Sequence, residues 1–232
     1  AAGHSDIAEV MVCMFGPTSD TYGLLHRGTR VRKMHSSYRS TFRTLGDTPL
    51  AMVGDGKLDL IHAKVRKRDK TRKLELRDSW DDRVALVYYV PNMKPDVVDS
   101  LVERGYKGIV IAGTGLGHVN RPLYEPLERA RDAGVAVYMT VQTLLGYAQM
   151  YVYDTGRDLL DRGVVPLGNM LPEVAYMKLG WALGQSEDPA EIRRLMLDTI
   201  SDEQTEREPP NGYIVLQGGI PEVDAFMANH YK

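Results

Sequence analysis

Cations and hydroxyl groups crowd the segment from Arg27 to Ser37, and Lys33 is its most informative member. A lysine withdrawn from water can hold a substrate carboxylate or lower the proton affinity of a neighbouring hydroxyl. Charged segments usually face solvent, however, and the residue types around Lys33 fit both interpretations. Composition alone therefore leaves a solvated surface and a catalytic lysine open.

A second candidate is the stretch from Gly113 to His118, which carries three glycines at alternate positions after an apolar run. Glycines so placed let backbone N–H groups come close to a ligand. The spacing does not match the GxGxxG pattern of dinucleotide sites. A tight turn explains the stretch equally well, so a site or subunit contact and a plain turn are both open.

A third candidate is the charged run from Lys64 to Lys73, which could follow a phosphate backbone. No aromatic residue interleaves its charges to stack bases, and the chain has 29 basic against 31 acidic residues. We therefore interpret the run as a solvated linker. The six histidines share no metal-ligand spacing with cysteines or carboxylates, so no metal site is predicted.

The elements that must position these residues fall into two parts with different patterns. The first part is β-rich and is predicted to contain a strand over 8–15, an irregular polar stretch over 16–40 and a hairpin over 49–61. The hairpin is predicted because two apolar runs flank Gly54-Asp55-Gly56, whose glycines can take positive φ angles. This part holds too little apolar surface to form a complete domain alone.

The second part alternates strands with helices. Strands are predicted over 84–90, 108–112 and 135–139, and helices over 95–104, 122–133 and 172–183, with a further helix opening at Asp188. Three strand–helix units in succession indicate a parallel, doubly wound sheet. Ligands of such sheets bind beyond the carboxyl ends of the strands, where the Gly113–His118 stretch lies.

Two details of the last helices can be predicted. Gly184 is expected to end the first of them, and Asp188, Pro189 and Glu191 resemble a capping box at the start of the second. Ile192, Leu195 and Met196 share one face and are expected in the core.

The single cysteine, Cys13, cannot form an internal disulfide, which favours a reducing, cytoplasmic location. No stretch approaches the roughly 20 apolar residues of a membrane-spanning helix, and the first residues do not resemble a signal peptide. Membrane and secretory classes are therefore not expected.

Placed in order, several segments resemble the asparaginase and glutaminase family along nearly the whole chain. They are residues 5–14, the block His26–Phe42, the strand-end block Ala112–His118, and Met170–Glu173 leading to Lys178. The last two, with Tyr153–Arg157 and Gly163–Pro166, resemble a branch of the family, the D subunits of archaeal amidotransferases. The signal comes from the order and spacing of these motifs.

The resemblance implies an α/β fold in three parts. Residues 1–62 would be a partial N-terminal asparaginase-type α/β domain, residues 63–83 a charged linker, and residues 84–232 a smaller, flavodoxin-like parallel-sheet C-terminal domain with a helical tail.

The family hydrolyses a side-chain amide with a threonine nucleophile, assisted by a second threonine, an aspartate and a lysine, and the lysine corresponds to Lys33. An ammonium beside the aspartate helps to lower the proton affinity of the attacking hydroxyl. The family's Thr-Gly-Gly-Thr and Gly-Thr-Asp motifs are absent from these 232 residues. Both would precede residue 1, so the resemblance implies an N-terminally truncated chain that is inactive alone.

The implied function is that of the glutamine-hydrolysing subunit of a tRNA-dependent amidotransferase, which converts Glu-tRNA(Gln) to Gln-tRNA(Gln). Its expected partners are an E subunit, which would use ATP and magnesium, a second copy of the chain contacting residues 113–120, glutamine or asparagine as substrate, and tRNA indirectly. No cofactor is expected to bind this chain directly. A stand-alone L-asparaginase and an inactive interaction scaffold are the alternatives.

Three departures from the family bear on that choice. Leu116 replaces an asparagine of stand-alone asparaginases, which favours the amidotransferase. Phe15–Thr18 replaces an expected His-Gly-Thr-Ser, and Tyr38 replaces an arginine, and both changes weaken the expectation of activity.

Overall fold

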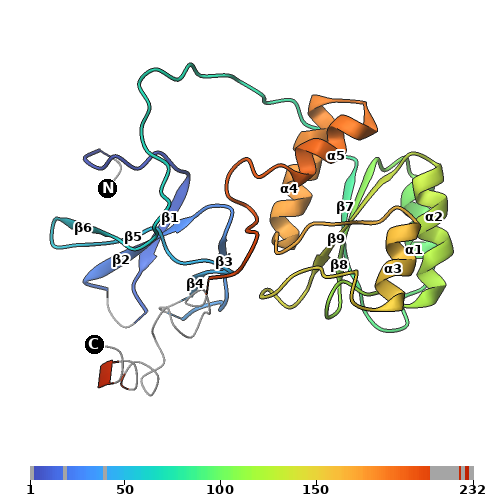
Figure 1. The fold of residues 1–232 in the computed structure, drawn as a ribbon, viewed down its shortest axis with the longest axis horizontal. Helices are drawn as coiled ribbons and strands as arrows, with labels where there is room; N and C mark the ends of the chain where they lie inside the picture. The colour runs from blue at the N-terminus through green and yellow to red at the C-terminus, as the bar shows by residue number, and fades with distance from the viewer. Residues whose placement is uncertain (1–2, 18–19, 39–40, 210–224, 226–227, 230–232) are drawn as a thin grey trace. The chain divides into compact units, whose positions relative to one another are not determined.

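The computed structural model describes residues 3–17, 20–38, 41–209, 225 and 228–229 (Figure 1). The chain divides into two compact units. The described part of the first lies within Ala1–Leu74 and Arg207–Lys232, and the second is Glu75–Glu206. No helix among the described residues is long and apolar enough to cross a bilayer.

The first unit is built from short antiparallel strands. They are β1 (Met11–Phe15), β2 (Tyr22–Arg27), β3 (Val31–Lys33), β4 (Phe42–Thr44), β5 (Ala51–Gly54) and β6 (Lys57–Leu60). Four of them form a sheet in the order β1-β2-β5-β6, and β3 pairs with β4 in a separate two-stranded sheet. The core is small, consisting of Ile7, Leu25, Leu50 and Ala51 with a few partly buried neighbours, as the low apolar content of this part predicts.

The predicted hairpin is confirmed as β5 and β6. Gly54 stands opposite Lys57, so the turn consists of Asp55 and Gly56, with φ angles of 48° and 73°. Two positive φ angles in a two-residue turn match the twist of the strands that it joins.

Two predictions for this part are wrong. The first strand begins at Met11 instead of Ala8, and the stretch 16–40 is not irregular, because it contains β2 and β3. Strand β2 escaped prediction because it ends in His26 and Arg27, polar residues that are buried here and hide the apolar pattern of the strand.

The beginning of the predicted linker pairs antiparallel with the first residues of the chain. Ala8 N–H donates to the Arg66 carbonyl at 2.8 Å, and Arg68 N–H donates to the Asp6 carbonyl at 3.0 Å. Ile7 and Lys67 form the bridge between these bonds. The basic run is thus anchored at its first residues, and further along Leu74 is 97% exposed.

The second unit contains a parallel sheet with helices on both faces. Its strands are β7 (Val84–Tyr88), β8 (Gly108–Gly113), β9 (Ala136–Val141) and β10 (Val165–Pro166), in the order β10-β9-β8-β7. Its helices are α1 (Asp96–Glu103), α2 (Tyr124–Asp132), α3 (Asp154–Asp161), α4 (Pro172–Gln185) and α5 (Pro189–Leu197), and a 3-10 turn, η1 (Arg121–Leu123), precedes α2. The predicted doubly wound α/β architecture is confirmed, while α3 and β10 were not predicted.

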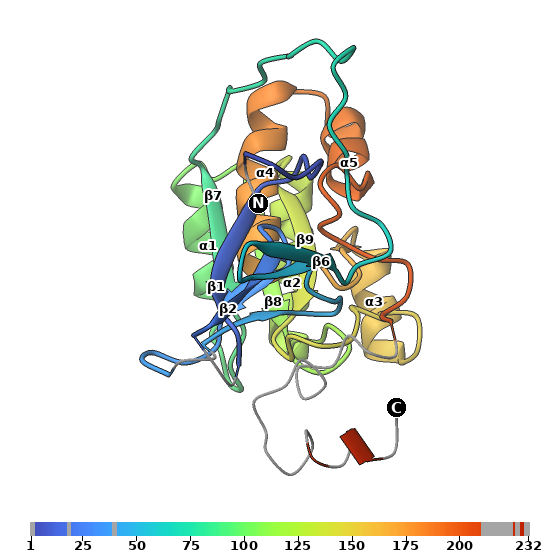
Figure 2. The same ribbon diagram turned by 90° about the vertical axis from the view of Figure 1, so that its left-hand side faces the viewer.

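Each face of this sheet has its own core. Helices α1, α2 and α3 cover one face, where Ile109, Val137 and Met139 are buried (Figure 1). Helices α4 and α5 cover the other, where Val110, Tyr138 and Leu179 are buried. Figure 2 shows α4 running along the strands, which it contacts at β7, β8 and β9.

Gly184 does not end a helix, contrary to the prediction, because α4 continues to Gln185. A Cβ at Gly184 would lie 2.4 Å from the Ser79 carbonyl oxygen, and a Cβ at Gly180 would lie 2.4 Å from the Trp80 ring. These glycines therefore let the extended segment 79–80 pack closely against α4.

The predicted capping box of α5 is half formed. The Asp188 carboxylate accepts a hydrogen bond from Ala190 N–H at 3.0 Å, as an N-cap residue should. Glu191 instead pairs with Arg194 at 2.7 Å, and Asp188 N–H donates to the Ser186 hydroxyl. Ile192, Leu195 and Met196 are buried, which confirms the predicted core face.

Candidate functional site

Lys33, the predicted catalytic residue, is the last residue of β3 and stands opposite Phe42 of β4. Its side chain is exposed and makes no hydrogen bond or ion pair with any residue that the structure describes. The amine is therefore presented to solvent at the loop end of the short β3–β4 hairpin. Its catalytic role stays a prediction.

The segment that follows Lys33 is held by local contacts. Met34 N–H donates to the Thr41 carbonyl at 2.6 Å, and the Thr41 hydroxyl donates to the His35 carbonyl. Ser37 N–H donates to His35 Nδ1 at 3.1 Å. The His35 ring in turn lies edge-on to Tyr38, with 5.7 Å between the ring centres. Hydroxyl and imidazole groups thus gather beside Lys33 on an exposed surface.

His26 fixes the base of the Lys33 hairpin. This β2 residue is fully buried, and its Nδ1 lies 2.9 Å from the hydroxyl of Thr44 on β4, the residue opposite Val31 of β3. Burial, helped by the positive charge of Arg43, lowers the pKa of His26 to about 4. The imidazole is consequently neutral at pH 7. Its Nε2 is buried with no hydrogen-bond partner among the described residues.

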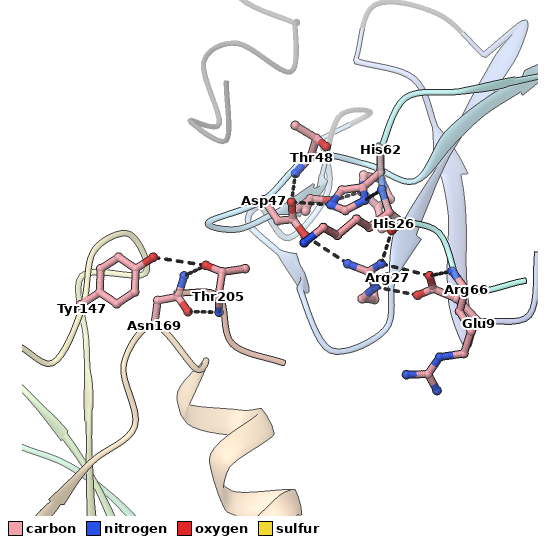
Figure 3. A network of polar contacts seen from close by, with 12 residues as sticks. Glu9, His26, Arg27, Asp47, Thr48, His62, Arg66, Tyr147, Asn169 and Thr205 are labelled. Atoms are coloured by element: carbon pink, nitrogen blue, oxygen red, sulfur yellow. Dashed lines mark hydrogen bonds and ion pairs between the residues drawn. The ribbon is translucent and has the colours of Figure 1, made fainter. Parts of the chain in front are cut away.

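The next residue of β2, Arg27, points into a buried polar network (Figure 3). Its Nε and Nη2 donate to the two oxygens of Glu9 at 2.6 and 3.0 Å, and its Nη1 donates to Asp47 at 3.1 Å. Nη2 also donates to the Lys64 carbonyl at 3.1 Å. One guanidinium therefore joins β2 to the start of the chain, the segment after β4 and the predicted linker.

Glu9 is ionised in this network, which favours its ion pair with Arg27. Burial opposes ionisation of Glu9, but hydrogen bonds from Arg27 and from the Arg66 N–H outweigh it and hold the pKa of Glu9 below its ordinary value. His62 Nδ1 accepts from Lys64 N–H, so a neutral His62 carries its proton on Nε2, which lies 2.9 Å from Asp47. The network thus orients Asp47 from two sides.

Sequence reasoning did not single out Arg27, Glu9 or Asp47. A signal was present, because the consecutive polar residues His26 and Arg27 end a strand whose Leu24 and Leu25 are buried. Neighbouring side chains of a strand point to opposite faces, so two polar residues in a row require a polar partner on each face. Partners as distant in sequence as Glu9 and Asp47 cannot be paired from composition.

In the second unit, the Gly113–His118 stretch forms a closed turn beyond β8. Thr114 N–H donates to the His118 carbonyl at 3.0 Å, and His118 N–H donates back to the Thr114 carbonyl at 2.9 Å. A Cβ at Gly113 would lie 2.8 Å from Met139 Sδ, and one at Gly117 would lie 2.9 Å from Met139 Cγ. Packing explains these two glycines. Gly115, with a φ of 52° and open space around it, is the one that leaves the backbone accessible.

His118 closes this turn and contacts the start of α3. Its Nδ1 is 3.1 Å from the Thr155 hydroxyl, and its ring lies 5.6 Å from the Tyr153 ring. Burial lowers the pKa of His118, and the charge of Asp154 opposes that shift in part. Three buried polar atoms at the strand ends, His118 Nε2, Asn120 Oδ1 and Thr140 Oγ1, have no hydrogen-bond partner in the described part of the chain.

Gln142 cross-links the strand ends. Its side-chain amide donates to the Tyr89 carbonyl at 2.5 Å and to the Ala112 carbonyl at 2.7 Å, and thereby joins the ends of β7, β8 and β9. Across the described residues of both units, no three His, Cys, Asp or Glu side chains are placed to hold a metal ion.

Two family models match the sequence. The N-terminal domain of asparaginase matches residues 1–66, and the glutaminase/asparaginase C-terminal domain matches residues 83–196. The matches leave out the middle of the charged segment between them.

Curated relatives share nearly half of their aligned residues with the chain. The D subunit of the glutamyl-tRNA(Gln) amidotransferase of Thermococcus kodakarensis is 50% identical over 202 residues, covering 87% of this chain and 46% of the relative. The corresponding protein of Pyrococcus furiosus is 48% identical over 212 residues, covering 91% of this chain and 48% of the relative. The chain spans about half the length of the curated relatives it matches.

Solved structures of L-asparaginases share the fold. The thermostable L-asparaginase from Thermococcus kodakarensis is 32% identical with a TM-score of 0.71, over 78% of this chain and 55% of the other. L-asparaginase I from Vibrio cholerae is 26% identical with a TM-score of 0.70, over the same shares of the two chains.

Proposed function

Because the chain belongs to the glutaminase and asparaginase family, we propose that it is part of the glutamine-hydrolysing subunit of a tRNA-dependent amidotransferase. Ammonia released from glutamine would pass to a partner E subunit, which converts Glu-tRNA(Gln) to Gln-tRNA(Gln). The observation that carries this proposal is the 50% identity to the D subunit of an amidotransferase over 87% of the chain.

The second candidate is a stand-alone L-asparaginase, which the TM-score of 0.71 to a solved enzyme of that activity favours. Identity to that enzyme is 32%, well below the identity to the D subunits. Leu116, where stand-alone asparaginases carry an asparagine, supports the amidotransferase as well.

In the proposed reaction, the positive charge of Lys33 helps to deprotonate the nucleophile. An ammonium close to the family's aspartate would help that aspartate and its hydroxyl partner to give up a proton. The His26–Thr44 contact at the base of the hairpin would hold the lysine in position. The Lys33 amine is exposed, so groups supplied from outside the described residues can reach it.

Turnover requires a nucleophile that this sequence does not carry in the family's motif. Neither Thr-Gly-Gly-Thr nor Gly-Thr-Asp occurs in the 232 residues. We therefore expect the chain alone not to hydrolyse glutamine or asparagine. Activity would need the part of the relatives that this chain does not span.

A homodimer is proposed through the strand-end loop of residues 113–120. His118 Nε2 and Asn120 Oδ1 are buried there without a described partner, and Tyr151, Val152 and Tyr153 are each more than half exposed. Light scattering on the chain joined to the remaining part of a D subunit should give the mass of a dimer. A monomer at micromolar concentration would overturn this part of the proposal.

The proposed function is tested by reconstitution. The chain is mixed with the remaining N-terminal part of the Thermococcus kodakarensis relative, and ammonia release is followed with glutamine or asparagine, with and without the E subunit and Glu-tRNA(Gln). We expect release from glutamine and formation of Gln-tRNA(Gln) only when all components are present. Preference for asparagine with no response to the E subunit would favour the stand-alone asparaginase.

A further inference from the structure

A groove of about 560 Å³ lies at the amino-terminal edge of the parallel sheet, the edge opposite the strand-end loops. It is bounded by the starts of β9 and β10, the end of α4 and the start of α5. Its apolar wall consists of Val135, Val137, Val165, Leu183 and Ile192. Its size falls in the range of about 300–1,000 Å³ that is usual for small-molecule sites. We call it the amino-edge groove.

Two of the four cations that line the amino-edge groove form ion pairs with described side chains, and two do not. Of its four cations, Arg83 pairs with Asp81 at 2.5 Å, and Arg131 pairs with Asp132 at 2.7 Å. The side chains of the other two, Lys107 and Arg193, make no hydrogen bond or ion pair with a residue that the structure describes, and both residues are exposed. Lys107 and Arg193 therefore have no direct partner in the described part of the chain, although the charge of Lys107 also acts on the Asp81 carboxylate, which lines the same groove.

Tyr138 contributes a polar group to the same groove. The residue is 2% exposed, and its hydroxyl has no hydrogen-bond partner among the described residues. Burial raises the pKa of Tyr138 to about 12, although the nearby positive charge of Arg193 opposes the shift. Because this pKa lies far above 7, the hydroxyl keeps its proton and remains a donor at pH 7. The hydroxyl is not among the fully buried, unpaired polar atoms of the described residues, so solvent in the groove reaches it and a ligand there could replace that solvent.

Glu187 adds the opposite charge. Its carboxylate lines the groove and makes no hydrogen bond or ion pair with the described residues, although the charge of Arg83 is near. A carboxylate beside cations discourages a ligand that is only an anion, whereas it can accept hydrogen bonds from sugar hydroxyls. The apolar wall would in turn cover a flat ring.

From this combination we propose that the amino-edge groove binds a ribonucleotide. Lys107 and Arg193 bind its phosphate, and the Tyr138 hydroxyl donates a hydrogen bond to a phosphate oxygen. Glu187 accepts from the ribose hydroxyls, and the base packs against the wall formed by Val165, Leu183 and Ile192. The site uses none of the residues of the strand-end loops and does not include Lys33, so it does not depend on the amide chemistry.

Calorimetric titration of the full chain with AMP and UMP tests the proposal, with ribose 5-phosphate, adenosine and inorganic phosphate as partial ligands. At least one nucleotide should bind with saturable heat, and each partial ligand should bind at least about tenfold more weakly. Arg193→Ala should weaken nucleotide binding at least about tenfold. Arg104→Ala removes an exposed charge of the same unit outside the groove and should leave binding unchanged.

Tyr138→Phe removes only the hydroxyl and keeps the packing of the ring, so it tests the site without disturbing the fold. We expect a several-fold loss of nucleotide affinity. Absence of binding at millimolar nucleotide, equal binding of inorganic phosphate, or an equal effect of Arg193→Ala and Arg104→Ala would each overturn the proposal.

Discussion

Arg27 donates two parallel hydrogen bonds to Glu9, from Nε to Oε2 at 2.6 Å and from Nη2 to Oε1 at 3.0 Å. The side chains of Arg27 and Glu9 are only 5% and 6% exposed. This fork arrangement is the strongest geometry for an arginine and a carboxylate. A buried ion pair adds little net stability, because desolvation offsets the attraction, but a single remaining partner is a buried, uncompensated charge. The pair therefore makes the first unit sensitive to the loss of either residue.

The first prediction is that Arg27→Met lowers the free energy of unfolding of the first unit by about 3–5 kcal/mol, because Glu9 and Asp47 lose their shared cation. Urea unfolding followed by circular dichroism measures the change. The double variant Arg27→Met/Glu9→Leu should be more stable than the single variant, since one of the orphaned charges is gone.

The matched control is Lys57→Met, which removes an exposed cation from β6 and should change the unfolding free energy by less than about 0.5 kcal/mol. If the unfolding curves of Arg27→Met and Lys57→Met coincide, the network does not stabilise the unit.

The sequence predicted the second unit far better than the first, and the reason is physical. Strands β7, β8 and β9 are covered on both faces and read as apolar runs, so their existence and parallel order could be inferred. Strand β2 ends in buried polar residues, and its partners Glu9 and Asp47 come from distant parts of the chain. Contacts of that kind are set by the fold and leave no local pattern.

The candidate sites also depend on contacts that no local sequence pattern reveals. Lys33 could be named only through the family resemblance, since the surrounding charges fit a solvated surface equally well. The amino-edge groove could not be predicted, because Lys107, Tyr138 and Arg193 come from three elements without a shared motif. In the sequence, Tyr138 looks like any other aromatic residue of a strand.

The second prediction concerns pH. The folded-state pKa of His26 is about 4, below its ordinary value of 6.5, so the unfolded chain binds more protons between these two values. Stability therefore falls as the pH is lowered through this window, by about 2 kcal/mol from pH 7 to pH 5. The unfolding free energy of the first unit at several pH values measures the slope.

His26→Gln should flatten that slope, because the replacement does not titrate between pH 5 and pH 7. The variant will itself be less stable at pH 7, so the comparison rests on the slope and not on the absolute value. A slope that is the same with and without the imidazole would show that other groups cause the pH dependence.

The third prediction reverses the usual effect of a helical glycine. Gly→Ala inside a helix ordinarily stabilises by about 0.5–1 kcal/mol. At Gly184 the added Cβ would lie 2.4 Å from the Ser79 carbonyl oxygen, a backbone atom. Gly184→Ala should therefore destabilise the second unit by about 1–3 kcal/mol, as overpacking does. Met177→Ala, at an exposed position of α4, should be close to neutral in the same thermal melts. A higher melting temperature for Gly184→Ala would contradict the packing argument.

The last prediction concerns Lys33 in the reconstituted enzyme. Lys33→Ala should reduce ammonia release from glutamine by at least about a hundredfold, because the group that assists proton removal from the nucleophile is gone. The loss should lie mainly in kcat, since the amine acts on the reacting hydroxyl and not on substrate affinity. Lys57→Ala removes another exposed lysine of the same unit and should retain full activity. Both substitutions should leave the unfolding free energy within about 0.5 kcal/mol, so an altered rate cannot be attributed to folding. Equal activity of Lys33→Ala and Lys57→Ala would show that Lys33 belongs to the solvated surface.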